Sequence, residues 1–571
     1  MYYELLEIKN KGTGKANIYV YRNTNGIISH FTSKQIKDNW VGNEFQGVVL
    51  DSLGRLIEKT AATPSSTPRL VTSAPISINT RGYQVYTGDG LQTLVDRVAS
   101  NKNKRYAVQQ IFDTLENYQT GKVCAVKGLR RTGKTTAIIQ VIGELLARGV
   151  SADHIGYITV TEAADTIEVV KLLGENTWEY VFVDEVTHLG GILNRLKTVS
   201  DVISIEKKVV LTGTDSYVWP VAAMDVLYGR TAPIDLTYMS LKEYCEVFPD
   251  RVKGLNHNDI VTHFCMYSGV LNMSEYVGMD NAYTSLQTAL AANIVNTIQR
   301  NKDHPTVKEH TGELYSASKE QITEAIICAI ITACETQNAD AFKTSGVKLP
   351  ALASDVFTLI DVERQAAVKA SGINQKVLLS LLSALVQLNV LSRVPNFAAK
   401  SAKVEPQGKT ELTCHISSLY STITGAIGSE VSVSGTAFEN LILSQCVQFC
   451  NALQQSYVAD GRLDSVEIGF CRYDIPADVF DGQTDKNPTP EVDIVVRSKI
   501  SGTLVKQVLI EVKKSADRSK HAANMLIPTM TEALGNIDRR IVVYSGETVT
   551  EREVEFVNAF DFLMDIGKYV L

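Results

Sequence analysis

The chain has 571 residues, which is more than one hydrophobic core organises, so we expect about three to five domains. Its composition, 44% hydrophobic and 21% charged, is typical of a folded protein and excludes the disordered, collagen-like and coiled-coil classes. The formal net charge of −7 gives no basic surface over the whole molecule, so any contact with nucleic acid must come from local patches.

The spacing of the cysteines and the length of the apolar segments indicate the cellular location of the protein. Nine cysteines form no CxxC pair and no disulfide-dense spacing, which favours reduced thiols in a cytosol. The first residues lack the basic and apolar regions of a secretory signal. The longest apolar run, 325–334, has about ten residues and is too short to span a bilayer. We therefore expect a cytoplasmic protein without membrane-spanning segments.

The N-terminal part, 1–60, is predicted to be a small β-rich domain. Asn25-Gly26 lies between two alternating runs and is a strong hairpin signal, and a second hairpin is predicted within 45–59. Its sequence contains no recognisable catalytic or ligand-binding motif, so we expect this domain to dock a protein partner. The segment 61–80 is rich in Pro, Ser and Thr and is predicted to be a flexible linker.

A phosphate-binding loop follows the first strand of an alternating α/β pattern that extends over 122–248 and predicts a parallel sheet. The strand 122–127 leads into GLRRTGKT, a complete GxxxxGK(S/T) motif, and a helical stretch comes next. We expect the loop's N–H groups to hold the phosphates, Lys134 to reach the β- and γ-phosphates, and Thr135 to bind Mg²⁺. The predicted nucleotide-binding residues are Gly128, Arg131, Thr132, Gly133, Lys134, Thr135 and Thr136.

A second buried run, 180–183, ends in Asp184-Glu185. Acidic residues at the carboxyl end of such a strand face the phosphate loop in open α/β sheets. We expect Asp184 to hold the Mg²⁺ shell and Glu185 to polarise the attacking water. The predicted cofactors are therefore ATP and Mg²⁺.

Two further residues are candidates for contacts with the γ-phosphate. Thr214 ends a third strand, predicted to lie between the first two; Thr212 is the second choice, and a threonine satisfied within a turn is the alternative. Arg230 precedes a predicted strand at 234–236. Its guanidinium is a candidate because such a group stabilises the charge that develops on the γ-phosphoryl group during hydrolysis. It would act in trans as an arginine finger or in cis as a sensor, or it is a surface charge.

Four segments together resemble prokaryotic AAA-family ATPases that carry a C-terminal domain of unknown function. They are GLRRTGKTT, YVFVDEV, LTGT and LYGRTAPIDLTYMSLKEYCEVF, and the resemblance covers 100–250 and 370–545. It implies an α/β fold class with a P-loop AAA-type core, a winged-helix segment and a restriction-endonuclease-like domain, and it favours a functional Arg230. The domains expected beyond the linker are the ATPase core (81–250), a helical lid (251–320), a winged-helix-like region (321–405) and the restriction-endonuclease-like domain (406–571).

Within the C-terminal domain, two alternating runs flank a turn at 501–503 and predict a β-hairpin. A hairpin centred on Gly502 places Asp493 opposite Glu511 and brings Lys513 to the same face. The same register sends six apolar residues to the other face: Val492, Ile494, Val496, Val508, Ile510 and Val512.

Paired carboxylates on neighbouring strands bind a hard divalent ion, and Lys513 would orient a nucleophile towards a phosphodiester. Asp493, Glu511 and Lys513 also resemble the D…ExK core of restriction-endonuclease-like nucleases, and Glu439 matches the acidic helix residue of that family. The resemblance implies a second divalent metal held by Glu439, Asp493 and Glu511. The alternative is an exposed strand face with a salt-bridged Glu–Lys pair.

The partners follow from these sites. Lys514, Arg518 and Lys520 form a basic cluster suited to a phosphate backbone, so DNA is the expected partner, with RNA as the alternative. A winged helix at 379–394 would present a recognition helix to DNA, but it contains few basic residues and a structural spacer is the alternative.

The predicted function is ATP hydrolysis coupled to a metal-dependent nuclease-like domain acting on DNA, in a nucleotide-dependent homo-oligomer; a mobile-element or defence role is compatible. The alternative is a nucleotide-dependent switch or scaffold whose C-terminal domain binds without cleaving.

Overall fold

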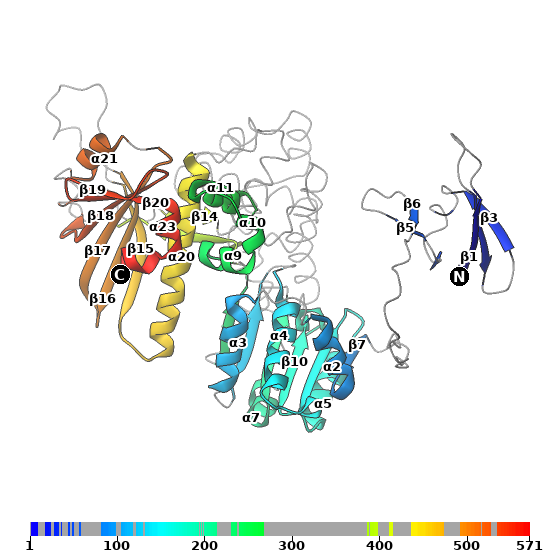
Figure 1. The fold of residues 1–571 in the computed structure, drawn as a ribbon. Helices are drawn as coiled ribbons and strands as arrows, with labels where there is room; N and C mark the ends of the chain where they lie inside the picture. The colour runs from blue at the N-terminus through cyan, green and yellow to red at the C-terminus, as the bar shows by residue number, and fades with distance from the viewer. Residues whose placement is uncertain are drawn as a thin grey trace, which may run out of the picture. The chain divides into compact units, whose positions relative to one another are not determined.

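A computed structural model divides the chain into two compact units, Met1–Ile78 and Asn79–Leu571 (Figure 1). In the first unit the described residues are 2–9, 18–23, 28–32, 36, 44–45, 48–50 and 56–58. In the second they are 82–98, 104–117, 121–128, 132–192, 195, 197, 199–213, 230–236, 239–267, 385–386, 389–397, 410–414, 435–472, 491–515, 517–526, 531 and 534–571. Arg131, Thr214 and most of the predicted lid and winged-helix region lie outside these residues. Within the described part of the chain, no helix is long and apolar enough to cross a membrane.

The first unit contains both predicted hairpins. One antiparallel pair flanks Asn25-Gly26, with Tyr19 opposite Phe31, and another places Leu50 opposite Leu56. An unpredicted strand, β1, also joins the first pair, and a register irregularity between Leu5 and Glu7 breaks the alternation that would have revealed it. The strands are β1 (Tyr2–Lys9), β2 (Ile18–Asn23), β3 (Ile28–Thr32), β4 (Glu44–Phe45), β5 (Val48–Leu50) and β6 (Leu56–Glu58).

The second unit begins with a six-stranded sheet that is parallel except for one antiparallel edge strand. Its strands lie in the order β12 (Thr231–Asp235), β8 (Val123–Lys127), β11 (Lys208–Gly213), β10 (Tyr180–Asp184), β9 (Ile155–Val160) and β7 (Tyr83–Tyr86). The predicted parallel sheet is confirmed, and β11 lies between β8 and β10 as expected. The antiparallel edge strand β7 was not predicted.

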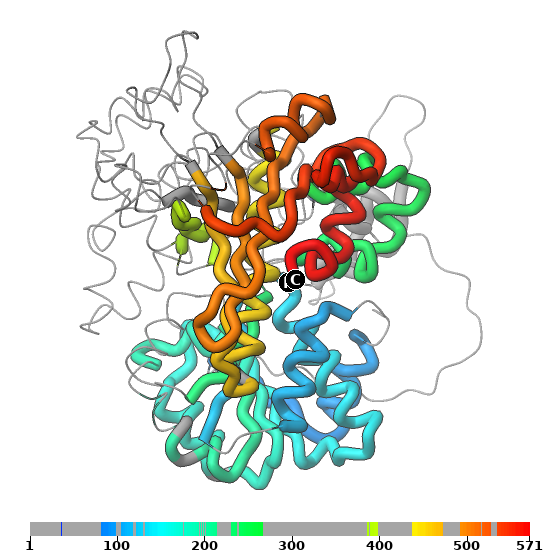
Figure 2. Tube along the Cα trace, turned by 90° about the vertical axis from the view of Figure 1, so that its left-hand side faces the viewer, coloured from blue at the N-terminus to red at the C-terminus, as the bar shows by residue number. Residues whose placement is uncertain are grey.

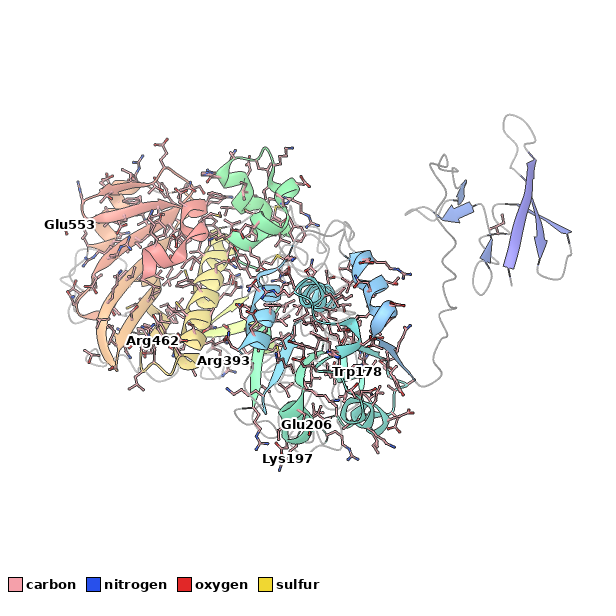
Figure 3. All side chains as sticks on the ribbon, turned by 60° about the horizontal axis from the view of Figure 1, so that its bottom comes forward. Trp178, Lys197, Glu206, Arg393, Arg462 and Glu553 are labelled. Carbon is pink, nitrogen blue, oxygen red and sulfur yellow. The ribbon has the colours of Figure 1, made fainter. Side chains whose placement is uncertain are left out.

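Helices cover both faces of this sheet, which explains why its central strands are almost wholly apolar. One face packs on α2 (Gly88–Val98), α3 (Tyr106–Glu116) and α4 (Lys134–Ala147), and the other on α5 (Thr166–Glu175). Gly156 in β9 makes room for Trp178, whose ring would come within 2.3 Å of any Cβ at that position. Figure 3 labels Trp178 among the side chains of this part.

A separate six-stranded sheet forms the C-terminal part: an antiparallel meander of three strands, two further strands that pair in parallel, and an antiparallel edge strand. Its order is β15 (Ser465–Arg472), β16 (Glu491–Ile500), β17 (Thr503–Val512), β18 (Arg539–Tyr544), β20 (Val554–Asn558) and β19 (Val549–Glu551). The long helix α20 (Gly435–Ala459) runs along one face, and α21 (Arg518–Met525) covers the other (Figure 2).

The predicted β16–β17 register is confirmed near the carboxylates, where Ile494 pairs with Ile510. The turn differs: Ile500 pairs with Thr503, and an irregularity between Ser498 and Lys499 restores the predicted register farther along the hairpin.

The prediction for Val492 is wrong. Two steps along β15, from Gly469 to Cys471, lie opposite three steps along β16, from Val495 to Val492. This bulge turns Val492 to the face that packs on α21, where it joins Val495, while the other five predicted apolar residues stay on the α20 face.

The predicted wing forms a strand. β13 (Leu391–Pro395) pairs antiparallel with β14 (Thr410–Cys414). The chain then joins the edge of the C-terminal sheet, because Asn396 bridges Phe470 and the Phe397 N–H donates to the Phe470 carbonyl at 2.7 Å. In the described residues this segment therefore extends the C-terminal sheet.

Short helices connect the two sheets along the chain. They are α9 (Leu241–Val247), α10 (Pro249–Val252) and α11 (His257–Tyr267), and Tyr244 packs edge-on against Phe264. The Gln445 side chain of α20 accepts the Leu241 N–H at 3.2 Å and donates to the Met239 carbonyl at 3.2 Å. The N-terminus of α9 is thus hydrogen-bonded directly to the C-terminal part.

Candidate functional site

The phosphate-binding motif lies between β8 and α4, and of its residues the structure describes Gly128 and 132–135. Gly133 adopts φ 91°, a left-handed conformation that glycine tolerates, immediately before α4 begins. Lys134 is 5% exposed, and its ammonium donates to the Gly128 carbonyl at 3.0 Å. A Cβ on Gly128 would lie 3.0 Å from the Thr132 hydroxyl, so this position requires glycine or a shift of the loop. A buried cation at the start of α4 is therefore hydrogen-bonded to the first residue of the motif.

The Asp184 carboxylate ends β10 and is held by three hydroxyl groups. The Thr135 hydroxyl donates to it at 2.7 Å, the Tyr157 hydroxyl at 3.0 Å and the Thr212 hydroxyl at 2.5 Å. Asp184 is only 4% exposed, so these donors replace the water that a charged carboxylate needs. The bond from Thr135 joins the start of α4 directly to the end of β10.

Glu185, the next residue, turns the chain sharply. It adopts φ 59° and ψ 37°, a left-handed conformation that is uncommon for a residue with a side chain and stores strain. Its N–H donates to the Thr212 hydroxyl at 3.1 Å, which holds the turn. Its carboxylate is about a quarter exposed and lies 4.0 Å from His188 Nε2. The turn leaves Glu185 partly accessible to solvent beside the buried Asp184.

Of the two threonines predicted to contact the γ-phosphate, Thr214 lies outside the described residues and Thr212 lies within them. Its hydroxyl is fully buried, donates to Asp184 and accepts the Glu185 N–H. The Thr212 side chain thus contacts both residues of the acidic pair, and its predicted contact with the γ-phosphate stays a prediction.

Two side chains at this site were not predicted. Tyr157 holds Asp184 from β9, and burial, reinforced by the Asp184 charge, raises the pKa of Tyr157 above its ordinary value, so the hydroxyl remains a donor. Arg105 donates to the Thr132 carbonyl of the phosphate loop. Both are contacts between residues far apart in the sequence, and neither residue belongs to a motif.

Arg230 lies at the other end of β8 from the phosphate loop. Its carbonyl accepts the N–H of Val123, the first residue of β8, whereas the loop follows Lys127, the last. Four steps of about 3.3 Å separate the two ends, so about 13 Å of strand lies between them. The Arg230 guanidinium pairs with Asp201 in the π-helical segment η3 (Val199–Ile203). A cis sensor would have to bridge this distance, so the two roles predicted for Arg230, in cis or in trans, both stay predictions.

In the C-terminal sheet the predicted carboxylates and lysine are gathered at one point. The Lys513 ammonium lies 2.7 Å from Glu511 Oε1 and 3.5 Å from Asp493 Oδ2. Asp493 also accepts the Val512 N–H at 2.6 Å, so its carboxylate spans the two strands. Burial alone would lower the pKa of Lys513, but Asp493, Glu511 and Glu439 together raise it above its ordinary value.

One cation, the Lys513 ammonium, partly neutralises this cluster of carboxylates. In the described residues no three His, Cys, Asp or Glu side chains are arranged to hold a metal ion, and Lys513 bridges the Asp493 and Glu511 carboxylates. Oxygen ligands suit a hard divalent ion, so the residues fit such an ion once the lysine moves. Helix α21 lies nearby: burial, with the charges of Lys513 and Lys520, lowers the pKa of His521.

Residues 120–245 match the family model described as an AAA domain. This part of the chain is an AAA-type P-loop ATPase domain. No curated protein matches the sequence.

Several solved structures are distantly similar. A Walker-type ATPase of Pyrococcus abyssi shares 13% identity over 56% of this chain and 94% of its own, with a TM-score of 0.29. RuvB of Thermotoga maritima shares 14% identity over 54% and 90%, with a TM-score of 0.24. AMPPCP-bound DnaA from Aquifex aeolicus shares 12% identity over 49% and 91%, with a TM-score of 0.23.

The Thr212 hydroxyl provides a test of this geometry. Thr212→Val keeps the shape of the side chain but removes one donor to Asp184 and the acceptor for the Glu185 N–H. We expect the rate of ATP hydrolysis to fall by about tenfold or more, because a lost buried hydrogen bond to a charged group is worth about 1.5–3 kcal/mol. Nucleotide affinity should change less, because Lys134 and the loop are untouched. Thr212→Ser retains the hydroxyl and should hydrolyse ATP at nearly the wild-type rate; equal rates for the Val and Ser variants would contradict the assignment.

Proposed function

We propose that this protein hydrolyses ATP through Lys134, Thr135, Asp184 and Glu185. The supporting observation is the 2.7 Å hydrogen bond from Thr135 to Asp184, which brings a hydroxyl and a carboxylate together next to the buried Lys134. Both are hard oxygen groups of the kind that Mg²⁺ prefers, so the residues fit the ion. Mg²⁺ held there would neutralise charge on the phosphates.

The chain's own groups have distinct roles in this proposal. Lys134 exchanges the Gly128 carbonyl for the β- and γ-phosphates, as a point charge at the centre of the loop. Glu185 orients the attacking water and accepts its proton, since its carboxylate is partly exposed beside Asp184. The further nucleotide contacts proposed are Gly128, Arg131, Thr132, Gly133 and Thr136, with Thr214 at the γ-phosphate.

ATP turnover is tested with two substitutions. Lys134→Ala should lose nucleotide affinity because the phosphates lose their cation. Glu185→Gln should bind ATP normally and hydrolyse it more slowly by about two orders of magnitude or more, because an amide cannot take the water's proton. Steady-state phosphate release and binding of a fluorescent ATP analogue measure the two effects. Wild-type hydrolysis by Glu185→Gln would refute the role of the acidic pair.

Arg230 is proposed to act in trans, because it lies at the far end of β8 from its own phosphate loop and its side chain is 46% exposed. In a nucleotide-dependent homo-oligomer it would leave Asp201 and reach the γ-phosphate of a neighbouring subunit.

Mixing two inactive variants tests this proposal. Arg230→Ala should bind ATP and fail to hydrolyse it, whereas Lys134→Ala supplies an intact Arg230 but binds no nucleotide. An equimolar mixture should regain part of the wild-type turnover, because each subunit provides what the other lacks. If the mixture stays inactive although native mass measurement shows mixed oligomers, Arg230 is not a finger.

A second activity is proposed for the C-terminal part: cleavage of phosphodiesters, in DNA before RNA, by a restriction-endonuclease-like domain. What favours it is the gathering of Asp493, Glu511 and Lys513 on a mixed sheet covered by helices on both faces, with Glu439 close enough to raise the Lys513 pKa. Glu439, Asp493 and Glu511 would hold a divalent ion, and Lys513 would orient the water.

The exposed Arg518 and Lys520, with Lys514, would meet the nucleic-acid backbone. The competing proposal is a nucleotide-dependent scaffold whose C-terminal part binds DNA or a protein partner without cutting. The first unit, Met1–Ile78, is proposed to dock a protein partner in either case.

Asp493→Asn separates cleavage from binding. Asparagine retains an oxygen for the Val512 N–H but loses the charge that a divalent ion needs, so Mg²⁺- or Mn²⁺-dependent nicking of plasmid DNA should disappear while ATP hydrolysis is unchanged. Asp538→Asn is the matched control, because Asp538 accepts the Gln507 N–H of the same sheet at 2.7 Å away from the cluster. Plasmid that stays intact with wild-type protein, yet shifts on a gel, favours the scaffold.

A further inference from the structure

Arg105, which directly precedes α3, is buried against the phosphate loop. Its side chain is 12% exposed, and its guanidinium donates to the Thr132 carbonyl at 3.2 Å and to the Leu236 carbonyl at 2.9 Å. It also makes two hydrogen bonds to the Glu243 carboxylate, at 3.0 and 3.3 Å. One planar group thus joins the phosphate loop, the end of β12 and helix α9.

The Thr132 carbonyl is the informative contact. A trans peptide is planar, so the Thr132 C=O and the Gly133 N–H lie in the same plane and point in opposite directions. The described residues contain no cis peptide bond. Because the Thr132 carbonyl is directed to Arg105, the Gly133 N–H is directed away from Arg105. The N–H groups of a glycine-rich loop before a helix are the ones that bind phosphate.

Glu243 makes this arrangement possible at a buried position. Its side chain is 7% exposed, and besides Arg105 it accepts the Tyr106 N–H at 3.0 Å. Its own N–H is capped by the Ser240 hydroxyl at 3.1 Å, which places it in the first turn of α9. A buried guanidinium without a carboxylate would be strongly unfavourable, so Glu243 keeps Arg105 in its place.

We propose that Arg105, fixed by Glu243, is a positioning residue that presets the Thr132–Gly133 peptide for phosphate binding. The inference rests on the proposed ATPase function and assigns to it two residues outside the nucleotide-binding motifs. Arg105 does not touch the reacting atoms in this arrangement; it acts through the peptide plane. Its removal therefore weakens nucleotide binding rather than the chemical step.

The test compares nucleotide affinity with turnover in the full-length protein. Arg105→Lys retains the charge but loses the planar fork that reaches two carbonyls and a carboxylate together. We expect the Kd for a fluorescent non-hydrolysable ATP analogue and the KM for ATP to rise by about tenfold or more, whereas kcat at saturating ATP stays within about threefold. Glu243→Gln should show the same split, and the double variant should be no worse than the stronger single one, because the two act as a unit.

Arg148→Lys is the matched control, because Arg148 pairs with Glu116 at an exposed position beyond the end of α4. The Arg148→Lys variant should bind the ATP analogue with the wild-type Kd. An unchanged Kd and KM in Arg105→Lys, or additive effects in the double variant, would overturn the inference while leaving the ATPase function intact. A loss of affinity that tracks a loss of thermal stability, with kcat falling in parallel, would make Arg105 merely structural. Wild-type protein that binds no nucleotide would overturn the proposed function together with this inference.

Discussion

The charge of Asp184 is the constraint on which the arrangement of the ATPase sheet depends. A carboxylate with 4% exposure needs donors, and they come from three elements: Thr135 in α4, Tyr157 in β9 and Thr212 in β11. These elements surround the end of β10 only because β11 and β9 are its two neighbours in the sheet and α4 follows β8. The strand order is therefore what brings the three donors to Asp184. The Thr212 hydroxyl also accepts the Glu185 N–H and so holds the left-handed turn at Glu185.

The features that the sequence predicts well are local. Consecutive apolar residues indicate β8, β10 and β11, and the glycine–lysine loop lies where its motif predicts, because each depends on neighbours along the chain. The β16–β17 register follows from alternation alone and is correct at Ile494 and Ile510. The role of each site residue stays a prediction.

The features that were missed depend on partners distant in the sequence. Tyr157 and Arg105 act on groups 27 residues away, and nothing in their neighbours marks them as polar contacts inside a core. Val492 faces the opposite side because its bulge arises against β15, a strand that the hairpin pattern does not contain. The position of Arg230 likewise depends on the pairing of β12 with β8, which places it at the far end of the strand from the loop.

The two carboxylate sites differ in how their charge is balanced, and this separates their chemistry. Asp184 is held by neutral hydroxyl groups, so its charge remains available to a cation beside Thr135. Asp493 and Glu511 already share the Lys513 ammonium, so a divalent ion must compete with a covalently attached cation. The Mg²⁺ that we propose beside Thr135 would meet a carboxylate that no cation shares in the described contacts, whereas the metal proposed at the C-terminal cluster would require Lys513 to move away. If the C-terminal part is the nuclease that we propose, a phosphate of the nucleic acid would attract the Lys513 ammonium and release the carboxylates, so substrate and metal would bind there together rather than in sequence.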